Sequence, residues 1–261
     1  MGEVMTANGD RTSVEGQGFV VFGAAGGIGA AICRALAERR ARVLCADAAE
    51  ERCAATADAI SLATDNQCLV AGADICDPAS IGTVLDRAIE AWGRLEGVVN
   101  CVGITGTTGI QSHEVDCHDF RHVLDVNLVG AFHVSQAAIR RMLPVGYGRI
   151  IHLASIAGKE GNAGMVAYSA SKAGLIGMVK SQGKEYATSG ITINAIAPAV
   201  IWTSLVDALP EEQIKYMTDK IPMARCGTLS EIADLVLWMA SPAASFTTGF
   251  TYDLSGGRAT Y

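Results

Sequence analysis

Short apolar runs alternate with longer segments of helical periodicity along the whole chain. The first run, Phe-Val-Val-Phe, is followed by a helical pattern, and the same order recurs to the end. Strands that alternate with helices of this length indicate a parallel sheet with helices on both faces, because each connection must cross back over the sheet. We expect strands at 19–22, 42–47, 68–74, 97–103, 149–155, 191–197 and 250–254, and helices at 30–40, 48–62, 80–92, 116–142, 165–186 and 229–239.

The domain organisation follows from the continuity of this pattern. No repeat, low-complexity tract or linker interrupts it, so residues 18–261 are predicted to form one Rossmann-type α/β domain, a doubly wound seven-stranded parallel sheet flanked by helices. The first seventeen residues are polar and lack the basic start and apolar centre of a signal peptide. We therefore expect a flexible polar tail over residues 1–17 and a cytoplasmic location.

Composition and charge narrow the class of partner. Half of the 261 residues are hydrophobic, which is enough for a sizeable core and excludes disorder over most of the chain. The net charge is −7 and there is no basic block, which argues against nucleic acid or an anionic membrane surface as partner. The most apolar stretch, residues 19–33, is too short to span a bilayer. A small-molecule substrate is the expected partner.

The eight cysteines show no Cys-x-x-Cys pair, and several lie inside apolar runs. We expect them to be small core residues in a reducing compartment rather than a disulfide framework.

A glycine cluster directly follows the first strand and leads into a helix. Gly23, Gly26, Gly27 and Gly29, with Ile28 between the last two, form it. Glycines at such a junction let the backbone approach a pyrophosphate, which the amide groups and dipole of the helix N-terminus stabilise. A tight turn alone would also explain the cluster, so its context matters.

Asp47 supplies that context at the end of the second strand. A carboxylate there accepts hydrogen bonds from the adenosine ribose hydroxyls and repels a 2′-phosphate. No Arg or Lys stands in the glycine loop or directly after Asp47. The sequence therefore predicts NAD rather than NADP as cofactor, although Asp47 is also suited to cap the following helix.

The spacing Gly23-x-x-x-Gly27-x-Gly29, together with Tyr168-Ser-Ala-Ser-Lys172, resembles the classical short-chain dehydrogenase/reductase family. The resemblance extends over about residues 18–257. It implies that Asp74 and Ile75 contact the adenine ring, and that a motif beginning at Asn100 and ending at Gly103 completes the cofactor site. It further assigns cofactor contacts to Pro198, Ile201 and Thr203, in the segment that holds the nicotinamide carboxamide. Phe22, Cys101, Val102 and Ala199 depart from the family pattern.

Several candidate catalytic residues lie within the region of this resemblance. Tyr168 and Lys172 are four residues apart, so a helix presents both on one face. A cationic Lys172 and the oxidised nicotinamide favour the phenolate, which makes Tyr168 a general base or acid. Ser155 is placed to stabilise charge on the substrate oxygen. By resemblance, Lys172 also holds the nicotinamide ribose and Asn127 orients a water that links Lys172 to solvent.

Residues 150–261 are similar to bacterial sugar and sugar-acid dehydrogenases, including those acting on 2-keto-3-deoxy sugar acids. We expect an NAD-dependent oxidoreductase of carbohydrate metabolism that acts on a secondary alcohol or ketone and, by resemblance, forms a homotetramer. Alternatives are a 3-oxoacyl-(acyl-carrier-protein) reductase, a polyol dehydrogenase, and a non-catalytic NAD-binding sensor or scaffold. Lys159 and Arg258 are the candidate partners of a substrate carboxylate.

A metal site is the competing hypothesis for residues 113–122. His118 and His122 have the i, i+4 spacing that zinc ligands use on a helix, and His113 and Cys117 lie nearby. By resemblance this segment enters a helix remote from the hydride path, so a solvated or interfacial helix face is expected and no metal.

Overall fold

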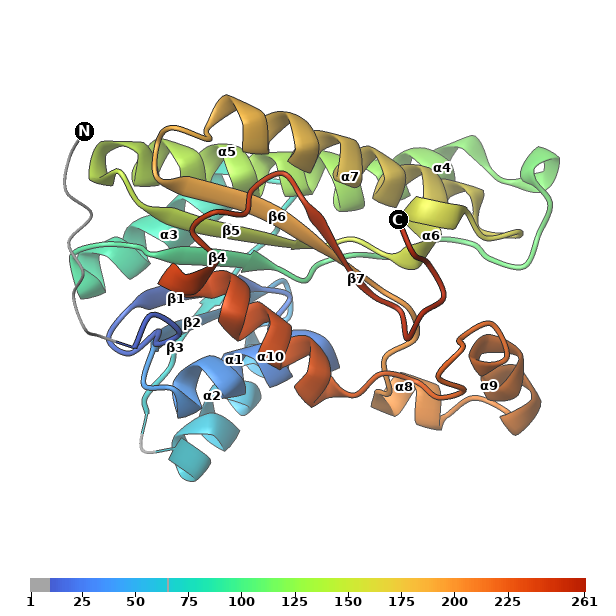
Figure 1. Cartoon of the computed structure of the whole chain (residues 1–261), viewed down its shortest axis with the longest axis horizontal. Coiled ribbons are helices and arrows are strands. Elements are labelled where there is room, and N and C mark those ends of the chain that lie inside the picture. Colours follow the sequence, from blue (N-terminus) through green and yellow to red (C-terminus); the bar gives the residue numbers. More distant parts are fainter. Residues whose placement is uncertain (1–9, 65) are drawn as a thin grey trace.

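The computed structural model describes residues 10–64 and 66–261, and within them seven parallel strands form one sheet. The strand order is β3-β2-β1-β4-β5-β6-β7, so the order reverses between β1 and β4 (Figure 1). The predicted doubly wound, seven-stranded α/β fold is confirmed. The strands are β1 (Gly18–Phe22), β2 (Arg42–Asp47), β3 (Leu69–Gly72), β4 (Gly97–Asn100), β5 (Gly148–Leu153), β6 (Ile191–Pro198) and β7 (Thr251–Leu254).

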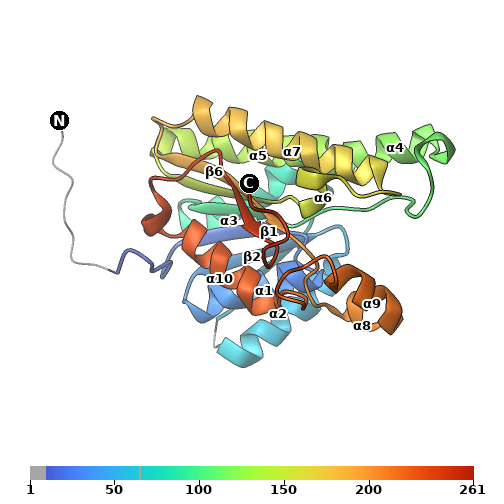
Figure 2. The ribbon, with the colours of Figure 1, turned by 45° about the vertical axis from the view of Figure 1, so that its right-hand side comes forward.

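Helices cover both faces of this sheet, as Figures 1 and 2 show. One layer contains α1 (Gly27–Glu38), α2 (Glu50–Thr64) and α10 (Leu229–Ala240). The opposite layer contains α3 (Pro78–Trp92), α5 (Gly130–Met142) and α7 (Val166–Glu185). Each helix follows a strand and crosses back over the sheet, as parallel connections require.

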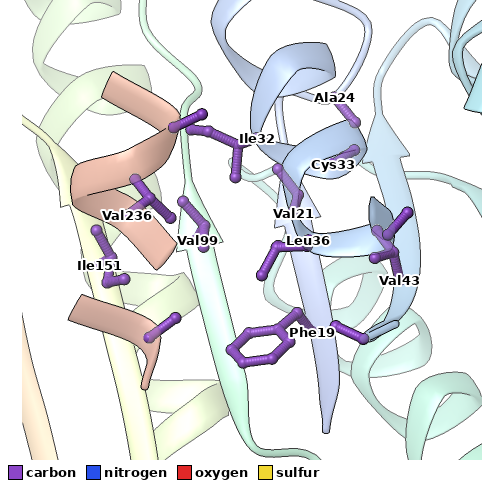
Figure 3. Packing of buried hydrophobic residues seen from close by; sticks show 14 of the residues in the cluster. Phe19, Val21, Ala24, Ile32, Cys33, Leu36, Val43, Val99, Ile151 and Val236 are labelled. Atoms are coloured by element: carbon purple, nitrogen blue, oxygen red, sulfur yellow. The ribbon is translucent and has the colours of Figure 1, made fainter. Parts of the chain in front are cut away.

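The core reflects the alternation of side chains along the strands. Phe19 and Val21 of β1 pack into the layer beneath α1 and α10, whereas Val20 and Phe22 pack into the opposite layer. Figure 3 shows the first layer, where Leu36 of α1 lies among the side chains that the sheet presents. Because β1 is buried on both faces, it consists of apolar residues without a polar alternation.

Three expected strands end earlier in the structure, and one expected helix is divided. The strands expected at 68–74, 97–103 and 149–155 end at Gly72, Asn100 and Leu153, so their last residues lie in the loops that follow the strands. The helix expected at 116–142 consists of α4 (Cys117–Leu124), a π-helical turn at Asp125–Val129 and α5.

The sequence did not predict three short helices, because each has too few residues to show a clear hydrophobic periodicity. They are α6 (Ile156–Glu160), α8 (Ser204–Asp207) and α9 (Glu211–Thr218).

Residues 10–17, which we expected to belong to a flexible polar tail, instead lie against the domain. Val14 is 1% exposed and belongs to the core beneath α1. Arg11 donates to the carbonyl of Pro242 at 3.2 Å and to Ser245 Oγ at 3.0 Å. The rest of the expected tail, residues 1–9, lies outside the described residues.

All eight cysteines are free thiols. Cys33, Cys45, Cys53 and Cys226 are buried, in line with the expectation of small core residues. That expectation is wrong for Cys76 and Cys117, which are exposed. Among the described residues, none of the helices is both long and apolar enough to cross a membrane.

Leu36→Ala should destabilise the fold by about 2–5 kcal/mol, because it removes a fully buried side chain between α1 and the sheet. Leu62→Ala is the matched control: Leu62 is 90% exposed, so the same change should stay within about 0.5 kcal/mol. Urea unfolding of both variants measures the difference. Equal losses would contradict the described packing of α1.

Candidate active site

The proposed site residues gather at one edge of the sheet because the strands are parallel and end together. Phe22 of β1 pairs with Asn100 of β4, and Asn100 pairs with His152 of β5. On the far side, Pro198 of β6 pairs with Leu254 of β7. The loops after all these strands therefore leave from the carboxyl ends of the strands. At this end of the sheet, the point between β1 and β4 where the strand order reverses is the usual ligand crevice.

The backbone of the glycine loop packs so closely against itself and against the loop after β4 that only glycine fits at two positions. A Cβ on Gly29 would lie 2.2 Å from the carbonyl oxygen of Gly23. Gly23 has φ +82°, and a Cβ there would lie 3.0 Å from the amide nitrogen of Val102. Gly26 precedes α1 and brings no side chain to cap it. The first turn of α1, which includes Ile28, thus offers backbone amides at an uncapped helix end, a fit for a pyrophosphate.

The carboxylate of Asp47 lies beside this loop and holds two backbone amides. It accepts from the amide of Ala25 at 3.2 Å and from that of Ala49 at 3.0 Å. Asp47 does not cap α2, as the sequence allowed, because Ala49 lies before the first residue of that helix and its bond to Asp47 closes a turn two residues long. Because each carboxylate oxygen carries two lone pairs, acceptor capacity remains for ribose hydroxyls.

Arg52 and Thr56 of α2 also bind the glycine loop, which sequence reasoning missed. Arg52 Nη2 donates to the carbonyl of Ala25 at 3.1 Å, and Thr56 Oγ1 donates to that of Ala24 at 3.4 Å. A cation therefore reaches the loop although none stands in it or directly after Asp47. The sequence feature that could have shown this contact is a basic residue, Arg52, in the first turn of the helix that follows Asp47.

The residues given to the adenine ring lie in the loop after β3. Asp74 is exposed, and its Oδ1 accepts from the amide of Cys76 at 2.8 Å. Ile75 is 4% exposed and packs against Gly130, where a Cβ would lie 2.8 Å from Ile75 Cδ1.

Asn100 is buried and shapes the turn after β4. Its Oδ1 accepts from the amide of Val102 at 3.1 Å, and its Nδ2 lies 3.4 Å from Nδ1 of His152. His152 Nε2 lies 2.8 Å from Ser135 Oγ. Burial lowers the pKa of His152 to about 3, so the ring is neutral at pH 7 and its Nδ1 accepts from Asn100.

The segment after β6 reaches towards the glycine loop. Pro198 ends β6, and Ile201, 6% exposed, bridges to Gly227. Thr203 precedes α8, and a methyl group on Gly27 would lie 3.4 Å from its Cγ2. Ala199 does not have the positive φ that would have strained an alanine.

Ser155 and Tyr168 approach each other from consecutive helices. Ser155 caps α6, where its Oγ accepts from the amide of Ala157 at 3.1 Å. Burial raises the pKa of Tyr168, and a hydrogen bond with Ser155 opposes that rise. The protein groups by themselves therefore raise the pKa of Tyr168, and they do not alone produce the lowered pKa that we expected.

Lys172 lies inside the protein, one turn after Tyr168. It is 3% exposed, and its Nζ donates to the carbonyl of Leu153 at 2.7 Å and lies 5.7 Å from the centre of the Tyr168 ring. Burial lowers the pKa of Lys172 to about 8, opposed by the nearby Cys101 thiol. A Cβ on Gly103 would lie 3.1 Å from Nζ, so this glycine gives the amine its space.

Asn127 occupies the π-helical turn between α4 and α5 and is 1% exposed. Its side-chain amide accepts from the amide of Ile104 and donates to the carbonyl of Ile104, both at 2.8 Å. It also donates to Ser171 Oγ at 2.9 Å, and Ser171 donates to the carbonyl of Tyr168. Asn127 therefore joins the loop after β4 to the helix of Tyr168. Single π-helical turns are frequent at functional sites.

The two cations considered for a substrate carboxylate are already paired with carboxylates of the chain. Lys159 Nζ lies 2.9 Å from Asp253 Oδ2, and Arg258 Nε lies 2.9 Å from Glu160 Oε2. Binding a substrate carboxylate would require either cation to share or exchange its partner.

The metal hypothesis gains no support from the geometry. Across residues 10–64 and 66–261, no three His, Cys, Asp or Glu side chains gather as a metal site would require. His118 and Cys117 lie on the exposed start of α4, where Asp116 caps the helix.

Comparisons with known proteins agree with this geometry. A family model described as enoyl-(acyl carrier protein) reductase matches residues 23–259. The chain is 44% identical over 192 residues to 2-dehydro-3-deoxy-L-rhamnonate dehydrogenase (NAD(+)) of Sphingomonas sp. (strain SKA58), covering 74% of this chain and 77% of that relative. It is 35% identical to 3-oxoacyl-(acyl-carrier-protein) reductase FabG of Escherichia coli (strain K12), covering 93% and 97%. A crystal structure of NAD+-bound xylitol dehydrogenase superposes with a TM-score of 0.88 at 26% identity, covering 94% and 99%.

The buried Lys172 should make stability depend on pH in a defined window. Because its pKa falls from 10.5 to about 8 on folding, unfolding takes up a proton between these values and wild-type stability rises with pH there. Lys172→Met lacks this contribution. The Tm of wild type minus that of the variant should therefore increase from pH 8 to 10.5, by roughly 2–4 °C for each kcal/mol gained.

Calorimetry across this range measures the difference. Lys184→Met, at an exposed position of the same helix, is the control and should leave the difference flat. A flat profile for Lys172→Met as well would show that the buried charge carries no such cost.

Proposed function

The chain belongs to the classical short-chain dehydrogenase/reductase family, and from that premise we propose that it is an NAD-dependent dehydrogenase of a small sugar or sugar acid. The family acts on CH–OH groups with a nicotinamide nucleotide. The proposed substrate is a secondary alcohol of a polar molecule such as a 2-keto-3-deoxy sugar acid. We propose Asn127, Ser155, Tyr168 and Lys172 as its catalytic residues.

The observation that carries the reaction is the meeting of Ser155, Tyr168 and Lys172 beside an uncapped glycine loop. The Ser155 hydroxyl lies near enough to Tyr168 to oppose the rise in its pKa, and Lys172 Nζ lies 5.7 Å from the centre of the Tyr168 ring. An aromatic hydroxyl, a serine hydroxyl and a buried amine at one sheet edge supply a proton acceptor, a hydrogen-bond donor and a positive charge. The substrate class rests on the similarity to the rhamnonate-type dehydrogenase.

Each of the three side chains has a distinct task in alcohol oxidation. A bound nicotinamide nucleotide supplies the hydride acceptor. Ser155 donates a hydrogen bond to the alcohol oxygen, and Tyr168 Oη takes the alcohol proton as the C–H bond breaks. Because the pKa of Lys172 is about 8, its amine is protonated at pH 7 and favours the phenolate form of Tyr168.

NAD is the proposed cofactor because the carboxylate of Asp47 lies at the end of β2, beside the loop. A phosphate on the ribose would meet this negative charge. Arg52, whose guanidinium donates to the carbonyl of Ala25 and keeps its positive charge, would offset part of that repulsion. The name of the Sphingomonas relative and the xylitol dehydrogenase structure both specify NAD, which supports the proposal.

A 3-oxoacyl-(acyl-carrier-protein) reductase is the second candidate. The Escherichia coli enzyme of that name matches 93% of this chain, more than the 74% that the Sphingomonas relative matches. Its identity is lower, 35% against 44%. The two candidates differ in substrate chemistry, so kinetics separates them.

We also propose a homotetramer, supported by exposed apolar side chains in two separate segments of the chain. Phe132 and Leu143, in and just after α5, are 42% and 43% exposed. Phe246 and Phe250, between α10 and β7, are 105% and 55% exposed. Apolar patches of this kind mark protein interfaces.

A panel of secondary alcohols tests the substrate and the cofactor together. With NAD, kcat/KM for a 2-keto-3-deoxy sugar acid should exceed that for a polyol and for a 3-hydroxyacyl thioester, and NAD should exceed NADP by at least about tenfold. Absorbance of the reduced nicotinamide gives the rates. The highest value with a 3-hydroxyacyl thioester and NADP would favour the second candidate, and NAD binding without turnover of any alcohol would favour a sensor or scaffold.

Tyr168→Phe should lower kcat by about 10²-fold to 10⁴-fold, because it removes the proton acceptor and leaves the ring in place. The Kd for NAD, measured by fluorescence titration, should change little. Tyr186→Phe, the same substitution just beyond the other end of α7, is the control and should retain activity. Unchanged kcat in Tyr168→Phe would exclude the proposed mechanism.

A further inference from the structure

The short helix α6 carries Ser155 at its start and depends on outside support. It has five residues, fewer than a helix needs to be stable by itself. Ser155 precedes its first turn, so any tilt of α6 moves the Ser155 hydroxyl relative to Tyr168 on α7. What holds the other end of α6 therefore affects the geometry of the candidate active site.

Residues 253–261, here called the clasp, hold that other end. Arg258 binds Glu160 Oε2 through Nε and Asn162 Oδ1 through Nη2, each at 2.9 Å. Tyr261 donates its hydroxyl to the carbonyl of Lys159 at 2.8 Å. In Figures 1 and 2 the C-terminal end of the chain lies beside α6.

The charges in this contact are largely removed from solvent. The side chains of Lys159 and Arg258 are 7% and 10% exposed, and their partners Asp253 and Glu160 are 26% and 28% exposed. Removal of one member of such a pair leaves the other charge poorly compensated, so the contact strongly favours one arrangement. Asp253 also accepts from the amide of Ser255 at 3.1 Å, which fixes the start of the clasp.

The opposite side of the clasp supports the segment that contains α8 and α9. The carbonyl of Gly256 accepts from the amide of Met223 at 3.1 Å. Gly256 has φ +63°, and a Cβ there would lie 2.6 Å from Cγ2 of Ile221. At Gly257 a Cβ would lie 3.3 Å from Cγ of Pro222. The 202–222 segment begins beside the glycine loop at Thr203, so the clasp joins this segment to α6.

We propose that the clasp couples the 202–222 segment to α6. We further propose that Arg258 is a positioning residue that keeps the Ser155 hydroxyl in its place relative to Tyr168. Arg258 acts through Glu160 and Asn162. Its effect on turnover rests on the proposed dehydrogenase function, whereas its effect on the two segments does not. Lys159 and Asp253 form the second attachment of the same clasp.

Arg258→Met tests this coupling directly. Hydrogen exchange should accelerate in peptides covering 155–168 and 211–223, because α6 and the 202–222 segment lose their shared support. With the alcohol that the wild type oxidises best, kcat should fall about tenfold or more while the Kd for NAD changes less than about twofold, since small displacements of positioning groups are costly to turnover. Arg258→Lys keeps one charged contact and should recover part of kcat.

Arg141→Met is the matched control. Arg141 of α5 forms an ion pair with Asp86 of α3, with distances of 2.7 and 2.8 Å, and among the described residues neither is a hydrogen-bond or ion-pair partner of the clasp. This variant should leave exchange in both peptides and kcat unchanged.

Three results would overturn the proposal. Unchanged exchange in both peptides of Arg258→Met removes the coupling, whatever the substrate proves to be. A rise of KM confined to acidic substrates, with kcat retained, assigns Arg258 to the substrate carboxylate instead. Loss of kcat in proportion to lost folded protein, matched by Arg141→Met, leaves only a general stabilising role. Failure of the alcohol panel with altered exchange would exclude the proposed function and keep the coupling.

Discussion

The ammonium group of Lys172 lies inside the protein and donates to the carbonyl of Leu153 at 2.7 Å. Transfer of a charge from water into such a place is costly, and the lowered pKa of about 8 records that cost. The surroundings of the amine are arranged to hold it: Gly103 leaves space beside Nζ, and α7 fixes the backbone one turn after Tyr168. In the proposed mechanism, this positive charge beside Tyr168 favours the phenolate that accepts the alcohol proton.

The position of Lys172 depends in turn on the parallel sheet, which brings distant segments to one edge. Leu153 ends β5, and Gly103 follows β4, its neighbour in the sheet. Asn127 binds the loop after β4 through Ile104 and reaches α7 through Ser171. The π-helical turn at Asp125–Val129 presents this amide while α4 and α5 continue on either side. Buried polar groups in such a network are stable only when their hydrogen bonds are satisfied, so the network fixes one geometry.

The glycine loop imposes a second constraint, because α1 must start very close to the end of β1. The carbonyl of Gly23 lies so near Gly29 that any side chain there would collide with it. This approach leaves the start of α1 open to an anion and places Asp47 beside the loop. Asp47 accepts a hydrogen bond from the loop, and Arg52 and Thr56 donate hydrogen bonds to it, so the three side chains hold the loop from one side.

The sequence by itself determined the parallel sheet, the glycine loop, the end of β2 at Asp47 and the helical pairing of Tyr168 with Lys172. These features are local: a period of hydrophobicity, a glycine spacing or a separation of four residues specifies each of them. Only the tertiary structure decided that Arg52 reaches the glycine loop, that Arg258 and Lys159 bind carboxylates of the chain, and that burial raises the pKa of Tyr168. Glu160 and Arg258 are 98 residues apart in sequence, and no local pattern encodes such a contact. It exists because β5 and β7 end at the same edge of the sheet, which brings the segments that follow them together.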